Sequence, residues 1–117
     1  MTKQYLESLL TGAKGNKNVK VINNTTVNGD DYHIKPYETL VVVNNTGSYT
    51  QNLYLPYVGE SVGMMLVIKV PDFGGGGTIY DNNDADSDWT DLTMNADNEY
   101  AVLFNNGRSW CTILSDM

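Results

Sequence analysis

From residue 19 onward, short apolar runs alternate with polar turns along the chain. The runs are rich in Val, Ile, Thr, Tyr and Leu, and clusters of Asn, Gly and Asp interrupt them about every ten residues. This spacing is typical of all-β sandwiches, rolls and barrels. We therefore predict a small, all-β, antiparallel sandwich or roll. Strands are expected at residues 19–27, 31–35, 39–45, 50–55, 64–70, 78–80, 92–95, 99–104 and 109–114.

Two glycine-containing segments predict connections between these strands. The run Phe104-Asn105-Asn106-Gly107-Arg108 contains Asn-Gly, which supplies the positive φ angles of a tight hairpin. Residues 74–77 are four consecutive glycines. A strand-like segment without lysine follows them, so they do not fit a phosphate-binding loop. They predict a flexible or closely approached hairpin connection instead.

Two of the predicted strands are apolar on both faces. Residues 39–43 read Thr-Leu-Val-Val-Val, and residues 64–70 read Met-Met-Leu-Val-Ile-Lys-Val. A strand that is apolar on both faces is expected to be buried on both. In so small a domain, the second face is either an interface between subunits or is covered by loops of the same chain.

The N-terminal segment has a different pattern. Leu6, Leu9 and Leu10 recur at helical spacing. A helix of roughly ten residues is not stable alone in water. We therefore expect this apolar stripe to pack against the domain, a sister subunit or a larger particle. The chain divides into a short helical or extended arm at residues 1–18 and a β-domain at residues 19–117.

The charge of the chain limits its partners. The 117 residues fit one domain and carry a formal net charge of −7. An acidic body repels phosphate backbones and anionic lipids, which argues against binding to nucleic acid or a membrane. The first 20 residues, however, hold four lysines and one glutamate. This basic arm is suited to docking on an acidic partner, or is simply solvated.

Residues for catalysis are scarce. His33 is the only histidine and Cys111 the only cysteine. Nucleophilic catalysis needs a base held beside a nucleophile, and the sequence gives neither residue such a partner. One His and one Cys also cannot form a zinc site of the usual type. We predict a strand histidine, a core cysteine, and no catalytic residue, metal or cofactor.

The Asp-rich segment at residues 81–91 is the one region that suggests a metal. Asp84, Asp86 and Asp88 open a calcium-loop pattern, but the positions that require Gly and Glu hold other residues. A solvated loop is the favoured interpretation, and calcium binding is left open. Closely spaced aspartates are also weak evidence for a glycoside hydrolase.

Aromatic side chains offer a second kind of site. Tyr and Trp stack on sugar rings when exposed, although strands also favour them for packing. The candidates for contact with a ligand or host glycan are Tyr54, Tyr57, Asp84, Asp86, Asp88 and Trp89.

Six short segments occur in a definite order between residues 32 and 114. They are residues 39–45, Leu53-Tyr54-Leu55-Pro56, Val62-Gly63 with residues 66–69, Gly77-Thr78-Ile79-Tyr80-Asp81, residues 92–94 before residues 100–104, and Asn106-Gly107-Arg108-Ser109-Trp110. Together, their order and spacing resemble a β-module of bacteriophage fibre, appendage and head-decoration proteins. The chain departs from that pattern at glycines 74–77 and in the Asp-rich loop, where a partner-specific surface is expected.

This resemblance implies a non-enzymatic virion protein that forms a homotrimer around a three-fold axis. The module would be a head fibre or capsid decoration piece, and its arm, through Leu6, Leu9 and Leu10, would attach it to other virion proteins. Phage proteins assemble in the bacterial cytoplasm, which agrees with the unpaired cysteine and with a start that lacks the apolar run of a signal peptide. The alternative function is a tail-fibre module that recognises glycans on the host surface.

Overall fold

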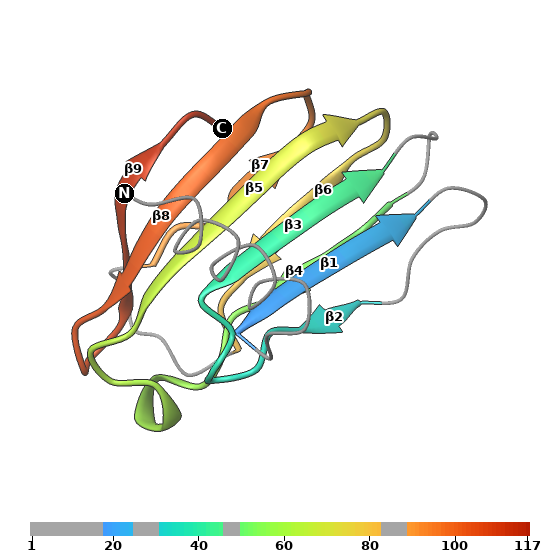
Figure 1. Ribbon diagram of the computed structural model, residues 1–117. Coiled ribbons are helices and arrows are strands. Elements are labelled where there is room, and N and C mark those ends of the chain that lie inside the picture. The colour runs from blue at the N-terminus through green and yellow to red at the C-terminus, as the bar shows by residue number, and fades with distance from the viewer. Residues whose placement is uncertain (1–17, 25–30, 46–49, 83–88) are drawn as a thin grey trace, which may run out of the picture.

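The computed structural model describes residues 18–24, 31–45, 50–82 and 89–117, and in these ranges the protein is all-β (Figure 1). The first sheet has five strands, in the order β1 (Val19–Asn24), β3 (Leu40–Asn45), β5 (Met65–Phe73), β8 (Glu99–Asn105) and β9 (Trp110–Ser115). The second has four, in the order β2 (Tyr32–His33), β4 (Leu53–Tyr54), β6 (Gly77–Tyr80) and β7 (Leu92–Met94). A short 3-10 helix, η1 (Val58–Glu60), precedes β5.

The strands do not form an antiparallel sandwich. From β1 to β6 the chain alternates between the two sheets, and each strand lies parallel to the one before it in its own sheet. Each coil of the chain thus contributes one strand to each sheet: β1 and β2, then β3 and β4, then β5 and β6. The three coils are stacked on one another, as in a short solenoid. Only β7, β8 and β9 add antiparallel pairings. The antiparallel prediction is therefore wrong, and both sheets are mixed.

Stacking in register places equivalent residues of successive coils beside each other. Val19 pairs with Leu40, and Leu40 with Val67. On the same strands, the side-chain amide of Asn44 donates a hydrogen bond to Asn23 Oδ1 at 3.0 Å. Such side-chain ladders are a regular consequence of parallel, in-register pairing.

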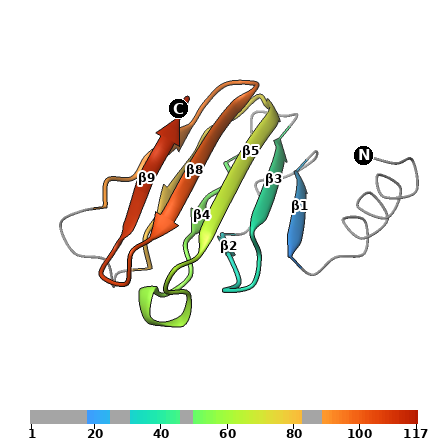
Figure 2. The ribbon, with the colours of Figure 1, turned by 60° about the vertical axis from the view of Figure 1, so that its left-hand side comes forward.

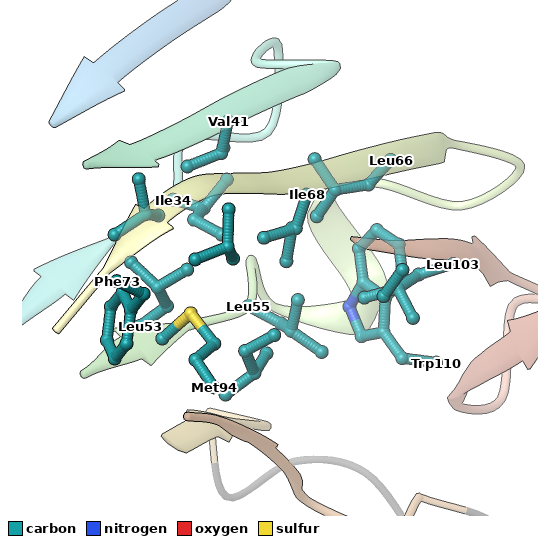
Figure 3. Close-up of a cluster of buried hydrophobic side chains, with 14 of the residues drawn as sticks. Ile34, Val41, Leu53, Leu55, Leu66, Ile68, Phe73, Met94, Leu103 and Trp110 are labelled. Carbon is teal, nitrogen blue, oxygen red and sulfur yellow. The ribbon is translucent and has the colours of Figure 1, made fainter. Parts of the chain in front are cut away.

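The core lies between the two sheets, as the close-up in Figure 3 shows. Strands of the first sheet contribute Val41, Leu66, Ile68 and Leu103, whereas the second contributes Leu53, Ile79 and Met94. Trp110 is fully buried at one end, and its indole N–H donates to the carbonyl oxygen of Pro56 at 2.9 Å. Burying a large apolar side chain contributes about 1.5–3 kcal/mol, so this layer is the main stabilising element.

A buried asparagine fixes the corner at this end of the core. The amide nitrogen of Asn105 donates to the carbonyl oxygen of Val58 at 3.0 Å and to Ser61 Oγ at 2.9 Å, while its Oδ1 accepts from the N–H of Gly107. These bonds hold η1 against the β8–β9 connection. The predicted hairpin is confirmed, with Gly107 at φ +90°, but the connection spans residues 106–109 and is longer than a two-residue turn.

The four glycines connect the first sheet to the second, so the predicted hairpin at this place is wrong. The close approach predicted for them is confirmed at Gly77, where an added β-carbon would clash with the carbonyl oxygen of Gln51. The predicted N-terminal arm, with Leu6, Leu9 and Leu10, lies outside the described residues except for Asn18.

Candidate functional site

The first sheet carries a broad apolar surface on the side away from the core. One row crosses all five strands in register: Val19 on β1, Leu40 on β3, Val67 on β5, Val102 on β8 and Leu114 on β9. We call this surface the apolar face. It also includes Val21, Val42, Met65, Phe104 and Cys111, which are half-buried or exposed.

No described element lies against the apolar face. The second sheet packs on the opposite side of β3, β5 and β8, as Figure 1 and the rotated view in Figure 2 both show. Leu114 is 53% exposed and Met65 48%. The two strands predicted to be buried on both faces are therefore buried by the described residues on only one.

The apolar face is also nearly uncharged. Within the described strands its rows include two charged side chains, Lys69 and Asp72, and Asp72 lies in the end row beside Asn44. The ammonium group of Lys69 lies 5.8 Å from the ring centre of Tyr100 and 3.4 Å from the carbonyl oxygen of Asn98. The chain as a whole carries a net charge of −7. Contiguous exposed apolar surfaces of this kind are typical of interaction sites.

The second sheet presents a different surface on its outward side. His33 on β2, Tyr54 on β4 and Tyr80 on β6 are neighbours in register and stack on one another. Ring centres lie 4.7 Å apart for His33 and Tyr54 and 5.1 Å apart for Tyr54 and Tyr80. We call these three residues the aromatic row. His33 is exposed, and the two tyrosines are half-buried.

A polar row runs beside the aromatic row, formed by the residues that directly precede β2 and β4 and by residues of β6 and β7. The side-chain amide of Asn52 donates to Asp31 Oδ1 at 3.3 Å, and its Oδ1 accepts from the backbone N–H of Thr78 at 3.0 Å. Thr93 on β7 pairs with Thr78 and is exposed. Asp31, Asn52, Thr78 and Thr93 together form the polar row. The outward side of the second sheet is therefore aromatic and polar, whereas that of the first is aliphatic.

A buried carboxylate lies near the first coil. Glu38 accepts two contacts from the hydroxyl of Tyr32, at 2.7 and 2.9 Å, and one hydrogen bond from the backbone N–H of Lys35 at 2.8 Å. Burial and the Glu38 carboxylate raise the pKa of Tyr32 well above its usual value. The ammonium groups of Lys20 and Lys35 lie 4.9 and 5.8 Å from the centre of the Tyr32 ring. This cluster ties β1 and β2 to the turn before β3.

The structure describes three of the six residues that the sequence grouped as ligand contacts. Tyr54 belongs to the aromatic row, and Tyr57 is exposed beside η1. Trp89 packs against the core, and its indole N–H donates to Asp91 Oδ1 at 2.8 Å. Asp84, Asp86 and Asp88 lie outside the described residues.

The sequence interpretation missed His33 and Tyr80 as partners of Tyr54. A signal was present: 21 residues separate His33 from Tyr54 and 26 separate Tyr54 from Tyr80, which are the repeats of the stacked coils. The prediction that Cys111 is a core residue is also wrong. It is half-buried on the apolar face, opposite Phe104, because Trp110 takes the inward position.

The described ranges contain neither a metal cluster nor a membrane-spanning helix. No group of three His, Cys, Asp or Glu side chains there is placed to hold a metal ion. Nor does any helix in the described ranges have the length and apolar character needed to cross a membrane. When the chain is compared with known protein families and with curated proteins, it matches no family model and no curated sequence.

Proposed function

We propose that this protein is a non-enzymatic structural module that assembles with identical copies through its apolar face. The observation that carries the proposal is the row of five apolar side chains that crosses the whole first sheet, Val19, Leu40, Val67, Val102 and Leu114. A partner that covers this row removes aliphatic surface from water, which stabilises the assembly by about 25 cal/mol for each Å² buried.

The size of the face favours a second copy over the chain's own arm. Five strands spaced about 4.8 Å apart span about 19 Å, and a six-residue strand is about 20 Å long. A ten-residue helix is about 15 Å long and about 10 Å wide. Such an arm would cover less than half of the face, and the remainder would still need a partner.

The few charged side chains on the apolar face also favour a second copy of the chain as its partner. Within the described strands the face presents one cation, Lys69, which already has Tyr100 and Asn98 as neighbours, and one carboxylate, Asp72, in its end row. Identical copies can therefore meet here without burying several unpaired charges, which is costly. Closed symmetry would also cover the exposed aliphatic side chains in every copy at once.

We further propose that the assembly is a homotrimer in a phage virion, as a head fibre or capsid decoration module. The six ordered sequence segments support this part of the proposal. Two of them are in contact, since Pro56 of the Leu-Pro segment accepts the hydrogen bond of Trp110 from the last segment. In this proposal residues 1–18 attach the module to other virion proteins in the host cytoplasm.

The assembly is tested by placing a charge in the centre of the face. Val67→Asp would bring a carboxylate from each copy into the interface, and we expect a monomer of 13.0 kDa by light scattering. The matched control is Val62→Asp, because Val62 is 63% exposed and lies outside the strands of the sheet. The proposal fails if both variants keep the mass of the wild type, or if the control dissociates equally.

The virion role needs a separate test. A chain that starts at residue 19 should keep the number of copies per assembly of the full chain. It should no longer be incorporated into purified particles, as measured by mass spectrometry. Incorporation at the level of the full chain would show that the arm is not the attachment segment. If the full chain is found in no purified particle, the virion proposal is wrong.

One observation favours the tail-fibre alternative as a second candidate function. Tyr54, one of the residues expected to contact a glycan, lies in a row of three aromatic rings on the outward side of the second sheet. Tyr57 and Trp89 do not join that row.

A further inference from the structure

We propose that the aromatic row and the polar row together form a binding site for a neutral carbohydrate chain. The site consists of His33, Tyr54 and Tyr80 beside Asp31, Asn52, Thr78 and Thr93. This proposal deepens the second candidate function. It does not depend on assembly through the apolar face, which lies on the other sheet.

The rings are stacked in a way that leaves ring surface available. Carbon atoms of stacked groups are in contact at about 3.5–4 Å. The ring centres of His33 and Tyr54 are 4.7 Å apart with planes 11° from parallel, and those of Tyr54 and Tyr80 are 5.1 Å apart at 27°. Both centre-to-centre distances exceed this contact distance, so the rings are not packed face to face at closest contact. His33 lies on the edge strand β2, where no described strand covers its other side.

The polar row supplies the second requirement of sugar recognition. A sugar ring has an apolar C–H face and a rim of hydroxyl groups that donate and accept hydrogen bonds. The Asn52 amide and the Asp31 carboxylate are held in place by their mutual hydrogen bond and by the N–H of Thr78. The hydroxyls of Thr78 and Thr93 are both donors and acceptors. Prepositioned polar groups beside a ring platform lower the ordering cost of binding.

The surrounding charges select a neutral ligand. Asp31 begins the polar row, and Asp91 precedes β7. The ammonium groups of Lys20 and Lys35 lie over the ring of Tyr32, and Lys69 is on the other sheet. An acidic sugar would therefore be repelled by the carboxylates of Asp31 and Asp91. The same carboxylates would repel a second copy docked on this surface.

The single histidine gives a direct probe of the site. His33 is the only histidine in the chain, so its ring proton signal in the NMR spectrum is isolated. The full chain is titrated with hexamers of α-linked glucose, β-linked glucose, mannose, galactose and N-acetylglucosamine, and with an acidic galacturonic acid hexamer. Concentrations reach about 10 mM, which detects millimolar dissociation constants. We expect at least one neutral hexamer to shift the His33 signal saturably, and the acidic hexamer to bind more weakly.

Variants separate the site from general effects on folding. Tyr54→Ala should weaken binding of that hexamer about tenfold or more, whereas Tyr54→Phe should retain it within about threefold because the ring remains. The matched control Tyr57→Ala removes an exposed tyrosine outside the row and should leave affinity unchanged. His33→Ala is a second variant, at the exposed edge of the row. Because it removes the NMR probe, its sugar affinity is measured by calorimetry, and it should also be weaker than that of the wild type.

Three results would overturn the proposal. These are the absence of a saturable His33 shift with all five neutral hexamers, equal losses in Tyr54→Ala and Tyr57→Ala, and tighter binding of the acidic hexamer. Failure here is distinguishable from failure of the assembly. Val67→Asp should keep the sugar affinity of the wild type. Tyr54→Ala should assemble into the same number of copies as the wild type.

Discussion

Gly77 shows, at the residue scale, how closely the stacked coils approach one another. The carbonyl oxygen of Gln51 occupies the space that a β-carbon on Gly77 would need, whereas nothing lies within 4 Å of that position on Gly76. The four glycines are therefore not equivalent. One is required by packing between coils, and its neighbour is free of that constraint. The sequence shows four identical residues and cannot separate these roles.

We predict that Gly77→Ala destabilises the fold by about 1–3 kcal/mol, because the added methyl group must displace backbone atoms. Gly76→Ala is the control, and we expect it to change the free energy of unfolding by less than about 1 kcal/mol. Urea denaturation followed by tyrosine and tryptophan fluorescence measures both. Equal stability of the two variants would contradict the close approach at Gly77.

Tyr32 leads to a prediction about alkaline pH. Its pKa is raised in the folded protein by burial and by Glu38, whereas in the unfolded chain it is about 10. Above about pH 10 the unfolded chain loses this proton first, so the stability due to Tyr32 is full below that pH and declines above it. Tyr32→Phe should therefore lose less stability between pH 9 and 11 than the wild type.

The control for this experiment is Tyr57→Phe, because Tyr57 is exposed, is not among the groups that raise the pKa of Tyr32, and should show the alkaline decline of the wild type. At neutral pH, Tyr32→Phe should itself be less stable by about 1–3 kcal/mol, since Glu38 loses its hydroxyl donor. Identical pH profiles for wild type and Tyr32→Phe would show that the hydroxyl is not held as described.

At the element scale, each of the nine described strands overlaps a segment that the sequence predicts, from β1 (Val19–Asn24) to β9 (Trp110–Ser115). Their pairing was not predictable in the same way. Alternating apolar residues indicate which side chains are buried, but hairpins and coils bury the same positions. The return of His33, Tyr54 and Tyr80 at intervals of 21 and 26 residues was the available signal for coils, and the loops between them blur that period.

The sheet order predicts a gradient of protection from hydrogen exchange. β5 lies between β3 and β8 in the first sheet, whereas β1 has β3 as its one described neighbour. Backbone N–H groups of β5 should therefore exchange most slowly, and those of β1 faster by at least about tenfold. Exchange of the two strands at equal rates would contradict the position of β1 at the sheet edge, or would show that a partner covers it.

At the scale of the whole molecule, the two outward surfaces differ in chemistry. One sheet presents a nearly uncharged aliphatic face, and the other presents aromatic rings beside carboxylates, an amide and hydroxyls. The proposed functions follow this division, with assembly on the first sheet and carbohydrate binding on the second. From the sequence, apolar residues on both sides of residues 39–43 indicated the first surface. The second depends on the parallel pairing and was therefore not found.

Sedimentation equilibrium of the wild-type chain, from about 1 to 100 μM, tests the self-assembly claim most directly. The proposal predicts a mass three times the 13.0 kDa of one chain, maintained down to the low micromolar range. A mass of 13.0 kDa throughout, in a folded protein, would contradict it, because the apolar face would then be stable in contact with water.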